Sequence, residues 1–155
     1  MSVLKPVTGK RPKLIGTDLD GTIVAHYGFI SERTKIAFTA AHEAGIHIYF
    51  VTGRPIRWMV EIKENFNFGI GICGNGAMLY DFINQKVLEE WLFSVKDQLE
   101  TVKRLREVIP PVTFALEIDG DFHREKHYTP RWDIGFDYEG VDKIEEAITK
   151  PALKL

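Results

Sequence analysis

The sequence has little cysteine, almost no excess charge and no long apolar run. Its one cysteine, Cys73, cannot form a disulfide within the chain. Lysine and arginine number 20 against 22 acidic residues, so the net charge of −2 offers no basic surface for nucleic acid. No stretch is long and apolar enough for a membrane span, and residues 1–10 lack the hydrophobic segment of a secretory signal. These absences favour a cytoplasmic protein that binds neither nucleic acid nor membranes.

Apolar residues are plentiful, at 45% of the 155 residues, which is enough for a real core. The pattern of the first half predicts strands at 13–17, 47–51 and 68–73. Helices are expected between them, one from the N-cap Ser31 to Gly45 and one from Pro55 to about Asn65, in which Trp58 and Met59 pack. Strands that alternate with helices in this way predict an α/β fold with a parallel sheet.

The second half has a different pattern. A strand is expected at 86–93, and Ser94 is placed to cap a helix that reaches Ile109. Alternating residues predict a further strand at 112–119, followed by a hairpin turn at 119–121 and a helix at 141–149. The two histidines of 123–127 lie between a glycine and a proline, which indicates a solvated loop more than a metal site.

Residues 18–22, Asp-Leu-Asp-Gly-Thr, carry the main chemical signal of the chain. Asp18 and Asp20 follow the first predicted strand directly. Two carboxylates so close together repel each other unless a cation offsets their charge. In an open α/β sheet, ligands bind at the carboxyl ends of the strands, where Asp18 is expected to lie.

Residues 18–22 resemble the first motif of the haloacid dehalogenase-like phosphohydrolases. Residues 46–55, a strand followed by Thr-Gly-Arg-Pro, resemble the second motif, and the Gly-Asn-Gly-Ala turn within 71–77 is similar to the Cof-like, sugar-phosphatase-like branch. The resemblance implies a Rossmann-like parallel-sheet core over residues 1–81. It also implies that residues 82–155 begin an α/β cap.

The same resemblance implies the chemistry. Asp18 would be the nucleophile that forms an aspartyl-phosphate, and Asp20 the general acid and then base. Mg²⁺ would be held by Asp18 and by the main-chain carbonyl of Asp20. Thr52 and the amide of Gly53 would bind the phosphoryl oxygens. The implied substrate is a small phosphorylated metabolite such as a sugar phosphate.

Three residues have alternative interpretations. Arg54 either reaches the substrate phosphate or begins a helix in solvent. Asn75 favours turn geometry first and a substrate contact second. Cys73, in an apolar strand, is expected to be a packed thiol and not a nucleophile.

The chain departs from the family pattern in its second half. A complete member carries a third-motif lysine and a fourth-motif Gly-Asp segment after the cap, and neither is found before Leu155. We therefore expect the N-terminal part of a longer protein, with the first strand left at the edge of the sheet. There are two alternative functions. The protein is a phosphomutase of the same superfamily, or it is a catalytically incomplete fragment that acts as a binding or regulatory module. The oligomeric state is left open.

Overall fold

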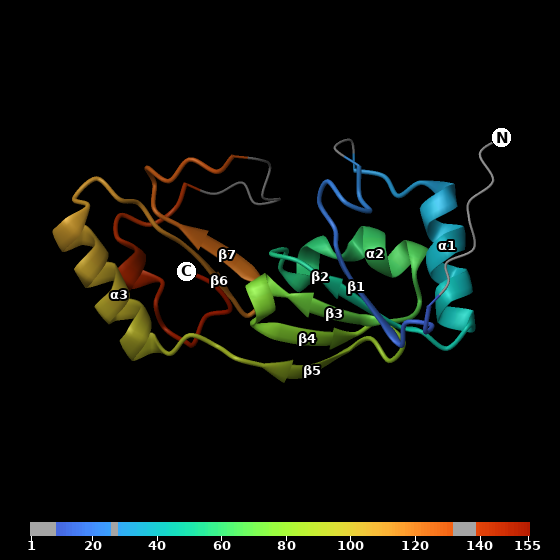
Figure 1. The fold of residues 1–155 in the computed structure, drawn as a ribbon. Coiled ribbons are helices and arrows are strands. Elements are labelled where there is room, and N and C mark those ends of the chain that lie inside the picture. Colours follow the sequence, from blue (N-terminus) through green and yellow to red (C-terminus); the bar gives the residue numbers. More distant parts are fainter. Residues whose placement is uncertain (1–8, 26–27, 132–138) are drawn as a thin grey trace.

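The computed structural model describes residues 9–25, 28–131 and 139–155. Its main sheet has the strand order β1 (Leu14–Asp18), β2 (His47–Val51), β3 (Ile70–Cys73), β4 (Met78–Asp81) and β5 (Lys86–Glu90) (Figure 1). The first three strands are parallel, whereas β4 and β5 are antiparallel to their neighbours. The predicted α/β fold with a parallel sheet is confirmed. Within the described part of the chain β1 lies at the edge, as expected, while β4 was not predicted.

The register of the parallel strands aligns their carboxyl ends. Asp18 lies opposite Val51 in the β1–β2 pair, and Val51 lies opposite Ile72 in the next pair. Beyond the strands, the amide of Thr52 donates to the Ile72 carbonyl at 2.9 Å, and the amide of Gly74 donates to the Arg54 carbonyl, also at 2.9 Å. The residues that follow β1, β2 and β3 therefore meet at one edge of the sheet, as the motifs predict.

The helix α1 (Glu32–Glu43) begins where predicted, because the Ser31 hydroxyl accepts from the Thr34 amide at 3.2 Å. It stops two residues before Gly45, whose φ of 78° is readily adopted only by glycine. The second predicted helix is split into a 3₁₀ turn, η1 (Ile56–Trp58), and a short α-helix, α2 (Val60–Asn65). The break falls at Met59, whose side chain is fully buried in the core.

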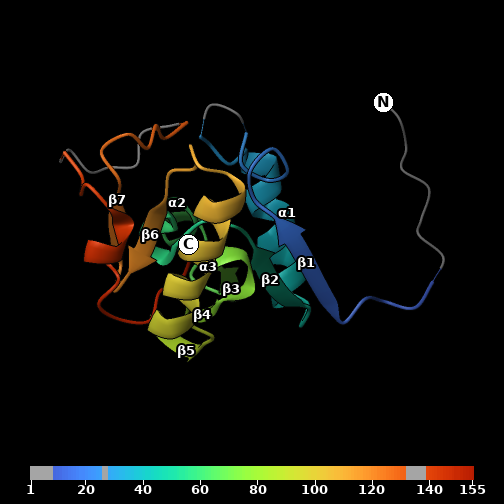
Figure 2. The same cartoon turned by 90° about the vertical axis from the view of Figure 1, so that its left-hand side faces the viewer.

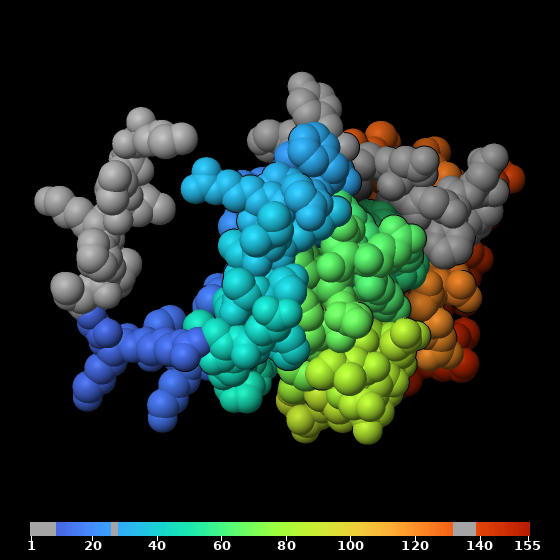
Figure 3. Space-filling model, turned by 90° about the vertical axis from the view of Figure 1, so that its right-hand side faces the viewer, coloured from blue at the N-terminus to red at the C-terminus, as the bar shows by residue number. Residues whose placement is uncertain are grey.

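Both helices cover the same face of the main sheet (Figure 1). The rings of Phe38 on α1, Phe50 on β2 and Phe66 after α2 pack together, with centroids 5.2–6.2 Å apart. Burial of such rings is worth more than their area alone, because offset aromatic pairs add about 1 kcal/mol. The opposite face is more open, and Val51 there is 40% exposed. In Figure 3 the segment that leads into β1 extends away from the body beside α1.

The described residues after β5 form a smaller unit at the end of the sheet toward which β2 and β3 point (Figures 1 and 2). Its helix α3 (Val95–Val108) starts at Ser94 as predicted. The strands β6 (Ala115–Ile118) and β7 (Asp121–Arg124) form a hairpin whose turn residues, Asp119 and Gly120, have positive φ, so the predicted turn is confirmed. The loop expected at 123–127 is wrong for its first two residues, which belong to β7.

The predicted helix at 141–149 is wrong, because only a 3₁₀ turn, η3 (Ile144–Glu146), forms there. Two contacts tie this segment to β7 and to the residue that follows it. The Val141 amide donates to the Arg124 carbonyl at 2.9 Å, and the Ile144 amide donates to the Glu125 carboxylate at 2.9 Å. Amides engaged in this way hold the segment against its neighbours in place of a longer helix.

Two hydrophobic clusters result. One lies between the main sheet and α1–α2, and the other lies between α3 and β6, where Val102, Leu116 and Ile144 are fully or almost fully buried. A division of the chain at residue 82 stays a prediction, and residues 132–138 of the expected cap lie outside the described residues. None of the described helices combines the length and apolar character that a bilayer crossing requires.

Candidate active site

The two aspartates after β1 are presented by a compact turn. The amides of residues 22–24 all donate to the carbonyl of Leu19, at 2.9–3.1 Å. Leu19 is completely buried, while Asp18 and Asp20 on either side of it are exposed. The Thr22 hydroxyl donates to Oδ2 of Asp18 at 3.2 Å. The buried leucine anchors the turn, so that both carboxylates face solvent at the carboxyl end of the strand.

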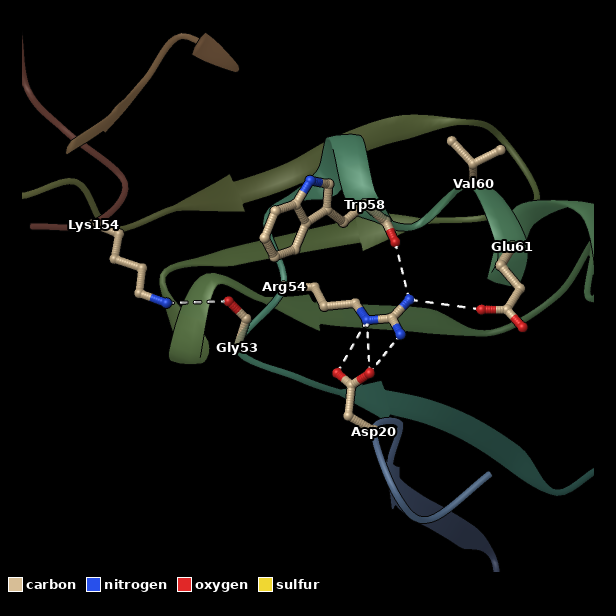
Figure 4. Close-up of a pocket in the computed structure, with 7 residues that line it drawn as sticks. All are labelled: Asp20, Gly53, Arg54, Trp58, Val60, Glu61 and Lys154. Carbon is tan, nitrogen blue, oxygen red and sulfur yellow. Dashed lines mark hydrogen bonds and ion pairs between the residues drawn. The ribbon is translucent and has the colours of Figure 1, made fainter. Parts of the chain in front are cut away.

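Asp20 is held by Arg54, a contact that the sequence alone did not reveal (Figure 4). The Arg54 guanidinium donates to Asp20 through Nε at 3.0 Å and through Nη2 at 2.5 Å. Its Nη1 donates to the Trp58 carbonyl at 3.2 Å and lies 3.7 Å from the Glu61 carboxylate. The hydrogen bonds with Asp20 raise the pKa of Arg54 above its ordinary value. With its side chain only 17% exposed, Arg54 is not a solvated helix start.

Thr52 and Gly53 lie at the end of β2, beside the first turn. Thr52 is buried, and its Oγ1 accepts from the Arg54 amide at 3.1 Å, which leaves its hydroxyl proton for another acceptor. A Cβ at Gly53 would lie 2.7 Å from Oδ1 of Asn75, so a larger residue there would force the Asn75 side chain to shift. Asn75 itself has φ 60° and ψ 30°, the left-handed turn geometry that its sequence context indicates, and its amide donates to the Thr52 carbonyl at 3.2 Å.

A cavity of about 730 Å³ opens beside these residues. It is lined by Asp20, Gly53, Arg54, Trp58, Val60, Glu61 and Lys154 (Figure 4). A second cavity of about 710 Å³, between the core and the second unit, shares Gly53, Trp58 and Lys154 with it.

Three lining residues were missed as functional candidates. Trp58 was expected to pack in a helix, and it is half-buried at the cavity wall. Glu61 stands one helical turn beyond Trp58, and burial raises its pKa. No local signal in the sequence marks Lys154, because tertiary contacts bring it to the cavity.

The acidic pair suits magnesium in the chemistry of its donors, since Mg²⁺ prefers oxygen ligands and keeps several waters. The exposed carboxylate of Asp18 provides one such donor. The Asp20 carboxylate is engaged by Arg54 although its side chain is 60% exposed. The family resemblance implies the main-chain carbonyl of Asp20 as a second donor. Within the described ranges no three His, Cys, Asp or Glu side chains gather as a metal site. The residues present fit part of a magnesium shell.

Comparison with known proteins agrees with this geometry. The chain is 29% identical over 126 residues to a Bacillus subtilis protein named "Putative phosphatase YxeH", an alignment that covers 79% of the chain and 44% of that protein. Among solved structures, BT1666 from Bacteroides thetaiotaomicron, a phosphatase of the haloalkanoate superfamily, superposes with a TM-score of 0.72 at 24% identity, covering 95% of the chain and 55% of BT1666. The sugar phosphatase BT4131 gives a TM-score of 0.67 at 21% identity, covering 90% of the chain and 56% of that structure.

The chain thus spans about half the length of the proteins it matches. The pattern that defines the haloacid dehalogenase-like hydrolases matches residues 15–152, which includes both aspartates, the Thr-Gly-Arg-Pro segment and the second unit. The chain therefore belongs to the haloacid dehalogenase-like hydrolase family.

Proposed function

We propose that the protein containing this chain is a magnesium-dependent phosphatase of small phosphorylated metabolites such as sugar phosphates. The observation that carries the proposal is the alignment of Asp18 and Thr52 at one sheet edge, with Asp20 held beside them by Arg54. The family assignment and the sugar phosphatase among the structural neighbours support it. The small charge excess and the buried Cys73 support a cytoplasmic enzyme that does not act on nucleic acid.

In this proposal Asp18 is the nucleophile. A carboxylate oxygen of Asp18 forms a bond to phosphorus while the bond to the leaving oxygen breaks, which gives an aspartyl-phosphate. Asp20 donates a proton to the leaving oxygen and then takes one from the water that hydrolyses the intermediate. The guanidinium of Arg54 contacts both carboxylate oxygens of Asp20, so it holds this group in one orientation between the two steps.

The phosphoryl oxygens would be bound at the end of β2. Thr52 has a hydroxyl proton to donate, because its Oγ1 already accepts from the Arg54 amide. The Gly53 amide lies next along the chain, and the absence of a Cβ there leaves room for the Asn75 side chain. Asn75 shapes this turn through its hydrogen bond to Thr52, and we assign it a positioning role before any substrate contact.

Magnesium, when bound by Asp18 and the Asp20 carbonyl, would neutralise the charge of the phosphoryl group and of the nucleophile. The third-motif lysine and fourth-motif carboxylates of the family have no counterpart in this chain. We therefore expect residues 1–155 alone to bind Mg²⁺ weakly and to have little or no phosphatase activity.

The proposal is tested by Asp18→Asn in the longer protein. Asparagine keeps the shape of the side chain and removes the nucleophile, so turnover of para-nitrophenyl phosphate should be abolished. Asp119→Asn is a matched control, since Asp119 is an exposed carboxylate in the β6–β7 turn whose partner is Lys150. Hydrolysis by the Asp18 variant at close to the parent rate would rule out the covalent mechanism.

A further inference from the structure

We propose that Lys154 binds a second anionic group of the substrate, so that the preferred leaving group carries a carboxylate or another phosphate. The proposal rests on the function proposed above, because it assumes that Thr52 and Gly53 hold the transferred phosphoryl group. It names the chemistry at the other end of the same cavity, which the family assignment does not specify.

Lys154 stands at the junction of the two cavities. It lines both of them together with Gly53 and Trp58, and its ammonium lies 3.5 Å from the Gly53 carbonyl oxygen. In Figure 4, Lys154 and Arg54 lie on either side of the Trp58 indole. A ligand in the cavity beside Asp20 and Arg54 would therefore meet a positive charge and an aromatic wall at this end.

Among the described residues, the Lys154 ammonium has no carboxylate partner of its own, unlike Arg54 at the other end of the cavity. Arg54 binds Asp20 and lies 3.7 Å from Oε2 of Glu61, while Oε1 of Glu61 is buried without a hydrogen-bond partner. Lys154 therefore brings the net charge of these four side chains to zero and places a positive charge at the end of the cavity away from the carboxylates. Within the described part of the chain, the Lys154 ammonium makes one long contact, to the Gly53 carbonyl, and no carboxylate lies within 4.0 Å of it. Lys150, four residues earlier, has an ion pair of 2.5 Å with Asp119.

The main chain of Lys154 is held by β6. Leu153 and Lys154 pair with Glu117 on β6 through hydrogen bonds of 2.8 and 3.0 Å. The Glu117 carboxylate is only 9% exposed and accepts from Arg57 of η1 at 2.6 and 3.2 Å. Because η1 closely follows Gly53 in the chain, this ion pair links the segment that carries Lys154 to the segment that carries the site.

The direction of one peptide separates Lys154 from the proposed phosphoryl position. The Gly53 carbonyl and the Arg54 amide belong to the same trans peptide, so they point in opposite directions. The amide points to the Thr52 hydroxyl, at 3.1 Å, and the carbonyl points to Lys154. Lys154 therefore lies on the far side of this peptide from Thr52, where it is placed for a second group of the ligand.

A matched pair of ligands tests this assignment. 3-Phosphoglycerate and glycerol 3-phosphate share a three-carbon skeleton and a phosphate, and they differ by a carboxylate in place of a hydroxymethyl group. Their affinities for the 155-residue chain can be measured by titration followed by amide NMR, which needs no catalysis. We expect the parent chain to prefer 3-phosphoglycerate, and Lys154→Gln to weaken its binding about tenfold at low salt, as for loss of a charge-assisted hydrogen bond.

The same substitution should leave the affinity for glycerol 3-phosphate within about twofold, since no charged contact is lost there. Lys150→Gln is the control, because it removes the same charge from the same segment and should change neither affinity. Equal weakening of both ligands would overturn the assignment and place Lys154 on the phosphoryl group. An unchanged preference for 3-phosphoglycerate, or no binding of either ligand by the parent chain, would also overturn it.

Thr52→Val distinguishes this proposal from the one on which it rests. If the phosphoryl site is as proposed, Thr52→Val weakens both ligands alike. If Thr52→Val has no effect while Lys154→Gln still removes the preference for the carboxylate, the second-anion site stands and the assignment of the phosphoryl site fails.

Discussion

Acidic side chains are exposed at the carboxyl end of β1, and others are buried in the unit formed by α3, β6 and β7. At the carboxyl edge of β1, Asp18 is exposed and the Asp20 side chain is 60% exposed despite its contact with Arg54. In the unit built on α3, β6 and β7, Glu117 and Glu125 are only 7% and 4% exposed. Glu125 accepts from the amides of Phe114 and Ile144 and from Arg106.

The difference separates charges that hold the structure from charges that are open to a ligand. A buried carboxylate is tolerated only when hydrogen bonds and a counter-charge replace its hydration. Glu125 meets this condition completely within the chain. Among the described residues, the Asp18 carboxylate accepts one hydrogen bond, from the Thr22 hydroxyl, so it keeps oxygen lone pairs available. The open pair is therefore where a cation and a phosphoryl group are expected.

Among the substitutions that test this difference between exposed and buried carboxylates, we expect the largest effect for Asp20. Asp20→Asn in the longer protein can still accept from Arg54 but has no proton to transfer, so kcat/KM for a sugar phosphate should fall roughly 10²–10⁴-fold. The loss should be smaller for para-nitrophenyl phosphate, whose leaving group needs little protonation. Steady-state kinetics with both esters measures this difference. An equal loss for the two esters would mean that Asp20 positions the substrate and is not the acid.

A change of stability, not of chemistry, is expected from Glu125→Ala. It removes the acceptor of two buried amides and the partner of Arg106, and it should lower the free energy of unfolding by about 3 kcal/mol. Urea unfolding of the 155-residue chain measures this value. Glu139→Ala is the control, because the Glu139 side chain is 83% exposed and its removal should change stability by less than about 0.5 kcal/mol. Similar small losses for both variants would contradict the structural role of Glu125.

Local signals explain which parts of the fold the sequence predicts. The caps at Ser31 and Ser94 depend on residues three positions away, and β2 was predicted with its exact bounds from one apolar run. β4 is short and is defined by its pairing with β3 and β5, which a local pattern does not show. The expected helix at 141–149 failed for the same reason, because partners on β7 and at Glu125 hold that segment.

The candidate site divides in the same way. Asp18, Asp20, Thr52 and Gly53 lie within short motifs and were predicted together with the sheet edge where they meet. The bond between Arg54 and Asp20 joins residues 34 positions apart, so only the folded chain shows it. Lys154 reaches the cavity through main-chain pairing with Glu117, and no pattern around residue 154 indicates this pairing.

The smallest effect is expected from a change at Cys73, which is completely buried at the end of β3, next to the turn Gly74–Gly76. Burial raises the pKa of its thiol from 9.0 to about 11. If buried groups are structural and exposed groups bind the ligand, the Cys73 thiol is structural although it lies close to the candidate site. Its thiol should then react with iodoacetamide at pH 8 much more slowly than a free cysteine does, because the thiolate is the reactive form.

The raised pKa of Cys73 also sets the sign of a pH effect on stability. Below pH 9 the thiol is protonated in both the folded and the unfolded chain, so its contribution to stability is complete. Between pH 9 and about 11 the unfolded chain releases the proton first, and the contribution is lost as the pH rises.

Other groups titrate in this range, so the parent must be compared with Cys73→Ala. We expect the parent to lose up to roughly 2 kcal/mol more than the variant over this interval in urea unfolding. Parallel pH profiles for the two chains, together with rapid alkylation at pH 8, would show that Cys73 is accessible and that the division between structural and open groups does not extend to the end of β3.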